Sequence, residues 1–453
     1  MGPVAASLKL KTLNDNPYLI QFTIMAYTIK HVSVEGLWDV KSFDTDFKRD
    51  VNILIGQNGS NKTTFLSLIE ACLMVEIRTL QQIPFRQMSL VLTSSEGEDK
   101  TLIVERCLSQ DVLKFKYTLP DDLESVEIRA YDEYEDRTWR SSSGIIMREH
   151  TARLKEIIGQ YIKMSWLSVD RQVVDYEDRR PRANVVDVKL NDLLRELVTY
   201  RQSLTEQINK QTLNLNSRVL SLLLYDEITD NFNSENLNRF IAMDPQEMQT
   251  NLFRVFSRMG KVDEFKDRIK HHIQMLTEAI NRVKAGETLL NSDVAPLVLI
   301  NKTIKMLDYS KSYKDVCDSI IEPLETYKKT LGRFIKDKAF SFSEDNGSMT
   351  IHYSYKNGNI EHLSFLRPQY LSSGEKQLLI LLTQTLLQEK QPFIFIADEP
   401  ELSLHIEWQR NIIGAINQIN PNAQIIVATH SPEIAGQWSK KIITMESITR
   451  YED

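Results

Sequence analysis

The sequence predicts an α/β fold in which two halves of one domain are separated by a helical insertion. Three observations support this prediction. An apolar run at 53–55 stops at a glycine-rich loop and is followed by a helical pattern through 65–69. A second apolar run at 393–397 ends in two carboxylates. Between them, from about 187 to 337, apolar residues recur at helical spacing with few strand signals.

The composition excludes several classes of protein. Hydrophobic residues make up 42% and charged residues 26% of 453, as in soluble globular proteins. No apolar run is long enough to cross a membrane, and no secretory signal is recognisable, so we expect a cytoplasmic protein without a membrane partner. The three cysteines are far apart and form neither a disulfide framework nor a metal motif. A net charge of −7 argues against a wholly basic nucleic-acid binder, although a local basic patch stays open.

The N-terminal half is expected to be rich in strands. Residues 1–24 carry no clear pattern and are assigned to an N-terminal extension of unknown structure. Met25 could be the natural start, and a genuine extension is the alternative. The predicted strands are 27–34, 89–93, 101–107, 114–119 and 126–131, of which 89–93 and 101–107 flank a polar turn and form a hairpin.

The glycine-rich loop at 56–61 suits a phosphate ligand. Loop amides and a helix N-terminus point at an anion, and we expect this helix to run from Lys62 to about Leu80. Lys62 can reach the β and γ phosphates of a nucleotide, and the Thr63 hydroxyl can ligate Mg²⁺. Asn61 replaces the last glycine of G-x-x-x-x-G-K-[ST], and Asn tolerates a left-handed backbone best among non-glycine residues. The predicted nucleotide-binding residues are Gly56, Asn58, Gly59, Asn61, Lys62, Thr63 and Thr64.

The C-terminal half supplies carboxylates and a histidine at strand ends. Asp398 and Glu399 follow a predicted buried parallel strand. Asp398 suits the Mg²⁺ shell, and Glu399 suits a base that polarises the attacking water. His430 follows the next predicted strand, 424–428, where an ordinary structural histidine is the alternative.

A second loop precedes an apolar helix that we expect to end near Leu387. Residues 371–377 read LSSGEKQ, and a serine and a glycine at a helix N-terminus offer a hydroxyl and amides to a phosphate. A simple helix N-cap is the alternative. The residues concerned are Ser372, Ser373 and Gly374.

In this order, these segments resemble the motifs of ABC-type ATPase heads of the RecF/SMC-like branch. LSSGEKQ resembles the ABC signature with Ser373 in place of a glycine, DEPELSLH resembles Walker B and the D-loop, and ATHSPEI carries the switch histidine. Gln172 resembles the Q-loop glutamine, which contacts Mg²⁺ and the attacking water; an ordinary surface glutamine is the alternative. The resemblance covers 27–172 and 340–450.

The resemblance implies an ABC-type P-loop ATPase head with an antiparallel β subdomain. It implies ATP and Mg²⁺ as cofactors, and two heads that sandwich ATP, so that His430 contacts the γ-phosphate and the signature contacts the nucleotide of a neighbouring subunit. The expected N-terminal lobe is 25–184, the helical insertion 185–338 and the C-terminal lobe 339–453.

The helical insertion is expected to be a compact bundle or a short hairpin, because heptads are not sustained for many turns. One of its turns is expected near Tyr309. Its basic residues could touch nucleic acid or a partner, and a solvated helix face is the alternative. These residues are Arg254, Arg258, Lys261, Lys266, Arg268 and Lys270, with His271 and His272.

The size and insert are most similar to the ATPase subunits of two-component antiphage systems. The AriA-type ATPase of PARIS is the first choice, and the PtuA-type ATPase of Septu is the second. This resemblance implies a homo-oligomeric ATP-hydrolysing switch that controls a separate effector, expected to be a nuclease, and answers to a phage-encoded trigger. A DNA-repair or chromosome-maintenance ATPase that clamps DNA is the alternative, and a non-hydrolysing scaffold is a third. Nucleic-acid binding stays open.

Overall fold

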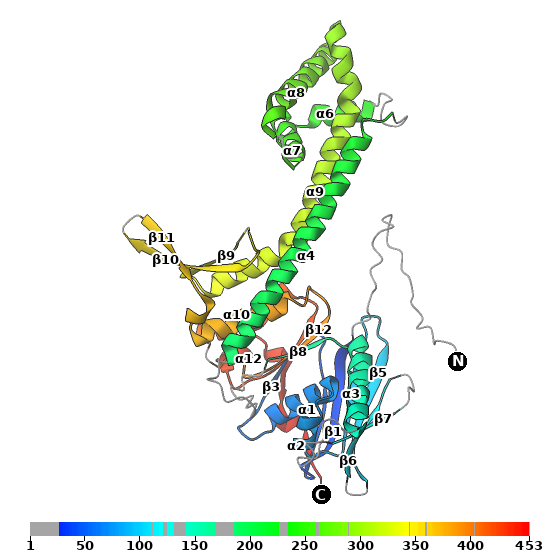
Figure 1. The fold of residues 1–453 in the computed structure, drawn as a ribbon, viewed down its shortest axis with the longest axis vertical. Coiled ribbons are helices and arrows are strands. Elements are labelled where there is room, and N and C mark those ends of the chain that lie inside the picture. The colour runs from blue at the N-terminus through cyan, green and yellow to red at the C-terminus, as the bar shows by residue number, and fades with distance from the viewer. Residues whose placement is uncertain are drawn as a thin grey trace, which may run out of the picture. The chain divides into compact units, whose positions relative to one another are not determined.

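The computed structural model describes residues 27–109, 112–120, 125–130, 142–167, 185–225, 234–258, 262–288, 290–343, 345–357, 360–402 and 404–452. The chain forms two compact units. Unit 1 consists of Met1–Asp170, Lys390–Ile413 and Pro421–Asp453, and unit 2 of Arg171–Glu389 and Gly414–Asn420. Segments from both ends of the sequence therefore build unit 1, as the blue and red ribbons of Figure 1 show.

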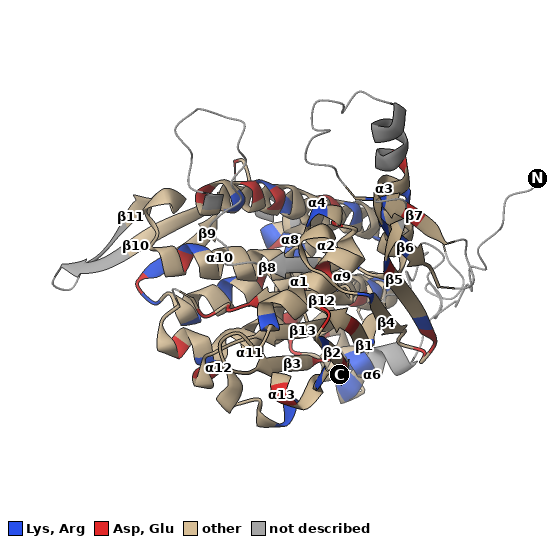
Figure 2. Ribbon diagram, turned by 90° about the horizontal axis from the view of Figure 1, so that it is seen from below, with Lys and Arg blue, Asp and Glu red and all other residues tan. Residues whose placement is uncertain are grey.

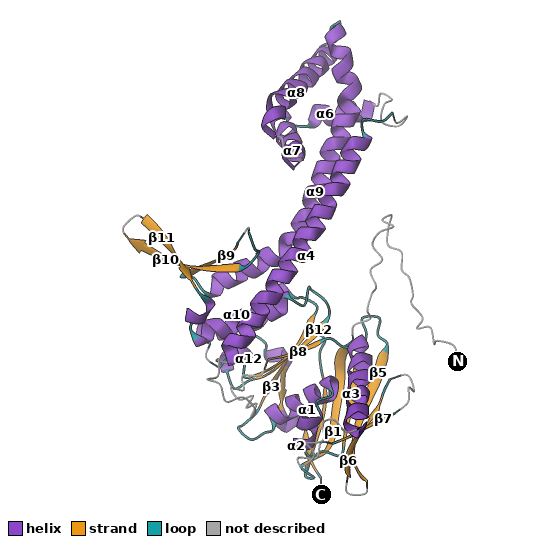
Figure 3. Ribbon diagram, in the orientation of Figure 1, coloured by secondary structure: helices purple, strands orange, loops and turns teal. Residues whose placement is uncertain are grey.

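A seven-stranded antiparallel sheet, in the order β15-β2-β1-β4-β5-β6-β7, forms one layer of unit 1 (Figure 3). Its strands are β1 (Thr28–Leu37), β2 (Lys41–Asp46), β4 (Gln87–Thr93), β5 (Asp99–Ser109), β6 (Val112–Thr118), β7 (Val126–Arg129) and β15 (Thr449–Tyr451). Alternate residues of a strand share a face, and β4 accordingly buries Met88, Leu90 and Leu92. The predicted hairpin is confirmed, with Leu90 opposite Leu102.

A five-stranded parallel sheet, in the order β14-β3-β13-β12-β8, forms the second layer. Its strands are β3 (Val51–Ile55), β8 (Met164–Leu167), β12 (Phe393–Asp398), β13 (Ala423–Ala428) and β14 (Ile442–Thr444). The helices beside these sheets are α1 (Lys62–Met74), α2 (Ile77–Gln82), α3 (Ser142–Tyr161), α11 (Ile406–Ile419), α12 (Pro432–Gly436), η3 (Ser439–Lys441) and α13 (Met445–Ile448). One hydrophobic core includes residues of both sheets and of α1, among them Val32, Phe65 and Ile396. The predicted α/β fold with an antiparallel sheet is confirmed.

The helix that follows the glycine-rich loop is shorter than predicted. In place of one helix to Leu80, α1 ends at Met74 and α2 begins at Ile77. Val75 adopts a left-handed conformation with φ 54°, and the Glu76 amide donates to the Ala71 carbonyl at 2.9 Å. This geometry closes a helix, but glycine is its usual marker, so valine gave no signal in the sequence.

Unit 2 contains two long helices that pack along each other (Figure 1). They are α4 (Val185–Ser221), of 37 residues, and α9 (Asn291–Phe334), of 44 residues. At 1.5 Å per residue they are about 55 and 66 Å long. The shorter helices α6 (Ser234–Ala242), α7 (Pro245–Arg258) and α8 (Val262–Ala285) lie between them in the chain. The helical insertion is confirmed. The expectation of a compact bundle or a short hairpin was wrong for α4 and α9, whereas α6, α7 and α8 pack with α9 around one hydrophobic core. The turn expected near Tyr309 was also wrong, since Tyr309 lies inside α9.

The sequence pattern did not predict the long pairing of α4 with α9, because several buried positions are not aliphatic. On α4, Leu190, Leu193, Leu197, Tyr200 and Leu204 are buried at alternating spacings of three and four. On α9, Tyr313, Cys317, Tyr327 and Thr330 occupy buried positions. Their polar atoms find partners, since the Tyr313 hydroxyl lies 2.9 Å from the Thr212 hydroxyl of α4. Such residues interrupt the apolar periodicity by which a coiled coil is recognised.

Unit 2 also contains a small sheet and a further helix. The sheet, in the order β11-β10-β9, contains β9 (Lys338–Phe342), β10 (Met349–Asn357) and β11 (Ile360–Leu366). The segments η2 (Pro368–Tyr370) and α10 (Ser373–Leu386) follow. Gly347, with φ 72°, lies in the turn between β9 and β10, and the Asn-Gly pair that it completes is typical of such turns. The predicted lobe boundaries stay a prediction.

Candidate nucleotide-binding site

The glycine-rich loop connects β3 to α1, and β3 lies between β13 and β14 of the parallel sheet. Asn61 is the N-cap of α1 and adopts the left-handed conformation, with φ 68° and ψ 26°. The expectation that Asn supports this backbone is therefore confirmed. Its side-chain oxygen accepts a hydrogen bond from Lys41 Nζ at 3.0 Å. This contact holds the loop against the start of β2.

Two C-terminal residues pack against the loop, and neither was predicted. The Glu446 carboxylate accepts a hydrogen bond from the Gln57 amide at 3.3 Å. A Cβ atom at Gly56 would lie 2.6 Å from the Ser60 hydroxyl and 3.1 Å from Met445 Cβ. Gly56 is thus closely packed, since a side chain there would have to displace the Ser60 hydroxyl and shift Met445. A short helix more than 380 residues away in the sequence gave no local signal of this contact.

Lys62 begins α1, and its side chain turns back over the loop. Its Nζ donates to the Gly56 carbonyl at 2.9 Å and to the Gln57 carbonyl at 3.2 Å, and only 5% of the residue is exposed. Burial lowers the pKa of Lys62, although the nearby carboxylates of Asp398, Glu399 and Glu446 oppose that shift. A buried ammonium held by two carbonyls has hydrogen-bonding capacity that a phosphate can take over.

Asp398 ends β12, next to Ala428 of β13. Burial raises the pKa of its carboxyl, and the charges of Glu399 and Glu401 raise it further, while a hydrogen bond from Thr63 and the charge of Lys62 act in the opposite direction. Among the described residues, Asp398 Oδ1 is buried without a hydrogen-bond partner. A carboxylate oxygen in that situation, beside a threonine hydroxyl, is a fitting ligand for a hard cation.

Glu399 and His430 face each other across the ends of β12 and β13. His430 Nε2 lies 3.9 Å from Glu399 Oε1, and both side chains are more than a third exposed. Glu399 has a positive φ of 46°, which is uncommon for a residue with a side chain, and its amide donates to the Ala428 carbonyl at 2.8 Å. This backbone turns the carboxylate toward His430 and away from the strand direction.

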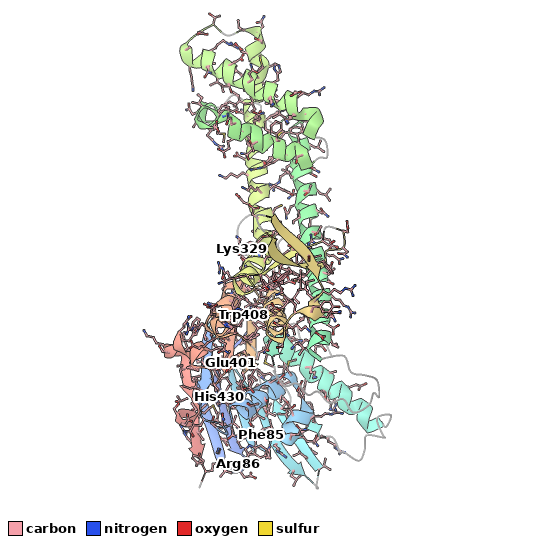
Figure 4. The ribbon with its side chains drawn as sticks, turned by 90° about the vertical axis from the view of Figure 1, so that its left-hand side faces the viewer. Phe85, Arg86, Lys329, Glu401, Trp408 and His430 are labelled. Atoms are coloured by element: carbon pink, nitrogen blue, oxygen red, sulfur yellow. The ribbon has the colours of Figure 1, made fainter. Side chains whose placement is uncertain are left out.

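Glu401 lies in the segment that resembles the D-loop, and the sequence did not predict its contacts. One of its oxygens accepts hydrogen bonds from the Thr429 hydroxyl, the His430 amide at 3.0 Å and the Ser431 amide at 3.2 Å. Figure 4 shows Glu401 and His430 close together. The partners are about 29 residues apart in sequence, so only the parallel pairing of β12 with β13 brings them together.

The signature segment lies in unit 2. Ser372 is the N-cap of α10: its hydroxyl accepts from the Glu375 amide at 3.3 Å, and Glu375 in turn accepts from the Ser372 amide at 2.8 Å. Gly374 is buried, whereas Ser372 and Ser373 are exposed. The N-cap alternative is therefore present at Ser372, and the exposed Ser373 stays available to a ligand. Glu375 also pairs with Lys338 of β9 at 2.6 Å.

The remaining predicted site residues lie partly within the described chain. Asn58 and Gly59 are exposed on the loop, Gly59 with φ 78°, and Thr64 lies in the first turn of α1. Gln172, the Q-loop candidate, lies outside the described residues, as does Ser403, which belongs to the D-loop segment. The structure thus brings Lys62, Asp398, Glu399 and His430 together within unit 1.

Comparison with known proteins identifies the family. The sequence profile of the AAA ATPase domain family (AAA_15) matches residues 28–435. The chain belongs to this family. The match includes the loop, both carboxylates and His430, whereas Met445 and Glu446 lie beyond it. Among the described helices, none is long and apolar enough to cross a membrane.

Two relatives and one solved structure are similar to this chain. The Retron Vc95 probable ATPase of Vibrio cholerae serotype O1 biovar El Tor is 22% identical over 88% of this chain and 70% of that protein. Septu protein PtuA of Bacillus thuringiensis is 31% identical over 22% of this chain and 27% of that protein. The third is the solved structure of the Smc head domain of Pyrococcus furiosus, which has an extended coiled coil and is bound to the C-terminal domain of ScpA. Its alignment covers 94% of this chain and 96% of the Smc chain, at 12% identity and with a TM-score of 0.42.

Proposed function

We propose that the chain is an ATP-binding and ATP-hydrolysing switch subunit. The grouping of Lys62, Asp398, Glu399 and His430 around one glycine-rich loop supports this proposal. The loop amides and Lys62 hold the β and γ phosphates, and Glu399 acts as the base toward the attacking water. His430, 3.9 Å from Glu399, contacts the γ-phosphate.

Thr63 and Asp398 are the proposed Mg²⁺ ligands. The unpartnered buried oxygen of Asp398, together with the hydrogen bond that links Asp398 to Thr63, fits the usual Mg²⁺ site of one or two protein oxygens completed by phosphates and water. An Mg²⁺ ion held by Thr63 and Asp398 would neutralise phosphate charge. Gln172 remains a further proposed ligand on the ground of the resemblance alone.

The proposed working form is at least a dimer with composite ATP sites. Each site combines the loop of one copy with Ser372, Ser373 and Gly374 of another. The exposure of the two serines at the α10 N-terminus supports this arrangement, because helix N-terminal groups attract phosphate. Hydrolysis by an isolated monomer would contradict it.

A mixing experiment tests the composite site. Chains with Lys62→Ala and chains with Gly374→Trp are each expected to be inactive. In a hybrid dimer, one of the two sites combines an unaltered loop with an unaltered signature segment, so mixing should restore part of the activity. Light scattering at the assay concentration should show a dimer or larger assembly. Failure of the mixture to recover any turnover, with hybrids demonstrated by differential tags, would contradict the proposal.

We further propose that this switch serves antiphage defence and controls a separate effector, expected to be a nuclease. The names of the retron and Septu relatives support a defence role. The finer assignment to the AriA-type ATPase of PARIS rests on the sequence resemblance, as does a phage-encoded trigger. The purified chain should hydrolyse ATP and leave DNA and RNA intact with Mg²⁺ or Mn²⁺. Nuclease activity that survives purification and disappears on mutating a carboxylate other than Asp398 or Glu399 would refute this division of labour.

The same preparation distinguishes the DNA-clamp alternative. In Figure 2, Lys and Arg are interspersed with Asp and Glu among the described residues. His272, one of the basic candidates of the insertion, bonds to the Thr303 hydroxyl at 2.9 Å, and burial lowers its pKa. His272 is thus engaged within the insertion itself. ATP hydrolysis stimulated by DNA, with a steep dependence on salt, would favour the clamp instead.

A further inference from the structure

The segment that carries His430 is held by a single carboxylate oxygen. Glu401 Oε1 accepts from three consecutive residues, Thr429, His430 and Ser431, and the Glu401 residue is only 9% exposed. Two of the three donors are main-chain amides. A side chain that binds successive amides fixes the path of the backbone and thereby the direction of the side chain between them.

We propose that Glu401 is the positioning residue for His430. This inference rests on the proposed function of the site and adds the residue that sets its geometry. Glu401 follows Glu399 by two residues, and Pro400 between them restricts the backbone. The same short segment therefore carries the proposed base and the acceptor that fixes the opposite strand end. Glu401 maintains the 3.9 Å approach of His430 to Glu399.

A second side chain supports the same segment from α11. The Ser431 hydroxyl donates to Gln409 Oε1 at 2.8 Å, and Gln409 Nε2 donates to the Leu404 carbonyl at 3.1 Å. The Ser431 hydroxyl also caps α12 by accepting from the amides of Glu433 and Ile434. Gln409 thus restrains Ser431, while contacts to the His430 amide come from Glu401.

The two oxygens of Glu401 differ in their contacts, so substitutions of this residue can separate loss of the acceptor from loss of the charge. Glu401 Oε2 is buried and has no hydrogen-bond partner among the described residues. Glu401→Gln retains an oxygen at the position of Oε1 and loses the charge. Glu401→Ala removes the acceptor, and Glu401→Asp keeps a carboxylate that is one methylene too short to reach all three donors. Glu407→Gln, at an exposed position of α11, is the matched control.

Hydrogen exchange tests the positioning contact without reference to turnover. In the full-length protein, the peptide that contains the His430 and Ser431 amides should be protected. Glu401→Ala should raise its exchange rate by about tenfold or more, because both amides lose their acceptor. Glu401→Asp should act in the same direction, which keeps the test usable if the alanine variant does not fold. Glu401→Gln should stay close to the wild type, as should Glu407→Gln.

A double-mutant cycle then tests whether the contact acts through His430. Glu401→Ala should lower kcat by about tenfold or more with little change in KM, and Glu401→Gln should recover most of it. In the double variant with His430→Ala, Glu401→Ala should cause no further loss. Independent, multiplying losses, or unchanged exchange at His430 and Ser431, would overturn the proposal. A wild-type chain that shows this protection without hydrolysing ATP would contradict the proposed function and leave the positioning contact intact.

Discussion

The side-chain amide of Gln424 pairs with the main chain of Ile29 as a neighbouring strand would. Gln424 Oε1 accepts from the Ile29 amide at 2.8 Å, and Nε2 donates to the Ile29 carbonyl at 2.7 Å and to the Lys48 carbonyl at 2.9 Å. β1 begins three residues before His31, the first of its residues that pairs with β2, which leaves this edge of Ile29 open. Gln424 closes that edge and joins the parallel sheet to the antiparallel sheet.

Gln424→Leu should destabilise unit 1. The substitution leaves the buried Ile29 amide and carbonyl without these partners, and an unsatisfied buried polar group costs about 1–3 kcal/mol. We expect the free energy of unfolding to fall by roughly 2 kcal/mol or more, measured by urea denaturation. Gln437→Leu, at an exposed position, is the control and should change it little. Equal stability of both variants would show that the pairing contributes nothing.

Lys62→Ala should abolish nucleotide binding. Lys62 Nζ is held by two carbonyls over the loop, at the proposed phosphate site, and this substitution removes the only lysine that the loop residues 56–64 supply. ATP affinity, measured by calorimetry, should fall by about 10²-fold or more. Lys114→Ala, on β6, should bind ATP normally. Near-normal affinity of the Lys62 variant would remove this residue from the phosphate site.

Glu399→Gln should separate binding from turnover. The amide keeps the size of the side chain but cannot accept a proton from water, so ATP should bind with wild-type affinity. Hydrolysis should fall by about 10²-fold or more. Single-turnover measurements with saturating protein provide the test, and Glu407→Gln is a suitable control. Wild-type turnover in Glu399→Gln would assign the base elsewhere.

The left-handed backbone at Asn61 predicts an order of tolerated residues. Glycine adopts this conformation freely, so Asn61→Gly should fold and bind ATP. A β-branched side chain is strained there, by roughly 1–2 kcal/mol, so Asn61→Val should lower thermal stability and weaken ATP binding. Both variants lose the hydrogen bond from Lys41, so a difference between them reports the backbone strain alone. Equal behaviour of the two would mean that the loop changes its path.

The raised pKa of Asp398 predicts a pH-dependent response to Mg²⁺. A carboxyl whose pKa is higher in the folded chain contributes stability below its ordinary value of 3.8, and this contribution is lost as the pH rises through the raised value. Mg²⁺ requires the ionised form, so thermal stabilisation by Mg²⁺ with ATP should increase with pH over that window. Asp398→Asn should raise the melting temperature of the ligand-free chain at pH 7 by a few degrees and remove the Mg²⁺-dependent part. Asp345→Asn, which is exposed, should do neither.

The parts predicted best from sequence are those whose signals are local. Strand, loop and helix around Lys62 follow one another in the chain, and continuous apolar runs marked β3, β12 and β13. The long helices were underestimated because Tyr313, Cys317 and Tyr327 replace aliphatic residues at buried positions. Glu401, Glu446 and Gln424 were missed as partners because each binds main-chain groups of distant segments. The type of a residue does not predict a contact of this kind.

The position of β3 in the sheet determines when the site can form during protein synthesis. Its neighbours in the parallel sheet, β13 and β14, begin at Ala423 and Ile442, and the Glu446 contact to the loop comes later still. At about 5–20 residues per second, a ribosome reaches these segments tens of seconds after it has made the loop. Until then the strand that supports the loop lacks both of these neighbours. The nascent chain should therefore be unable to bind ATP until β13, β14 and the segment of Glu446 have been made.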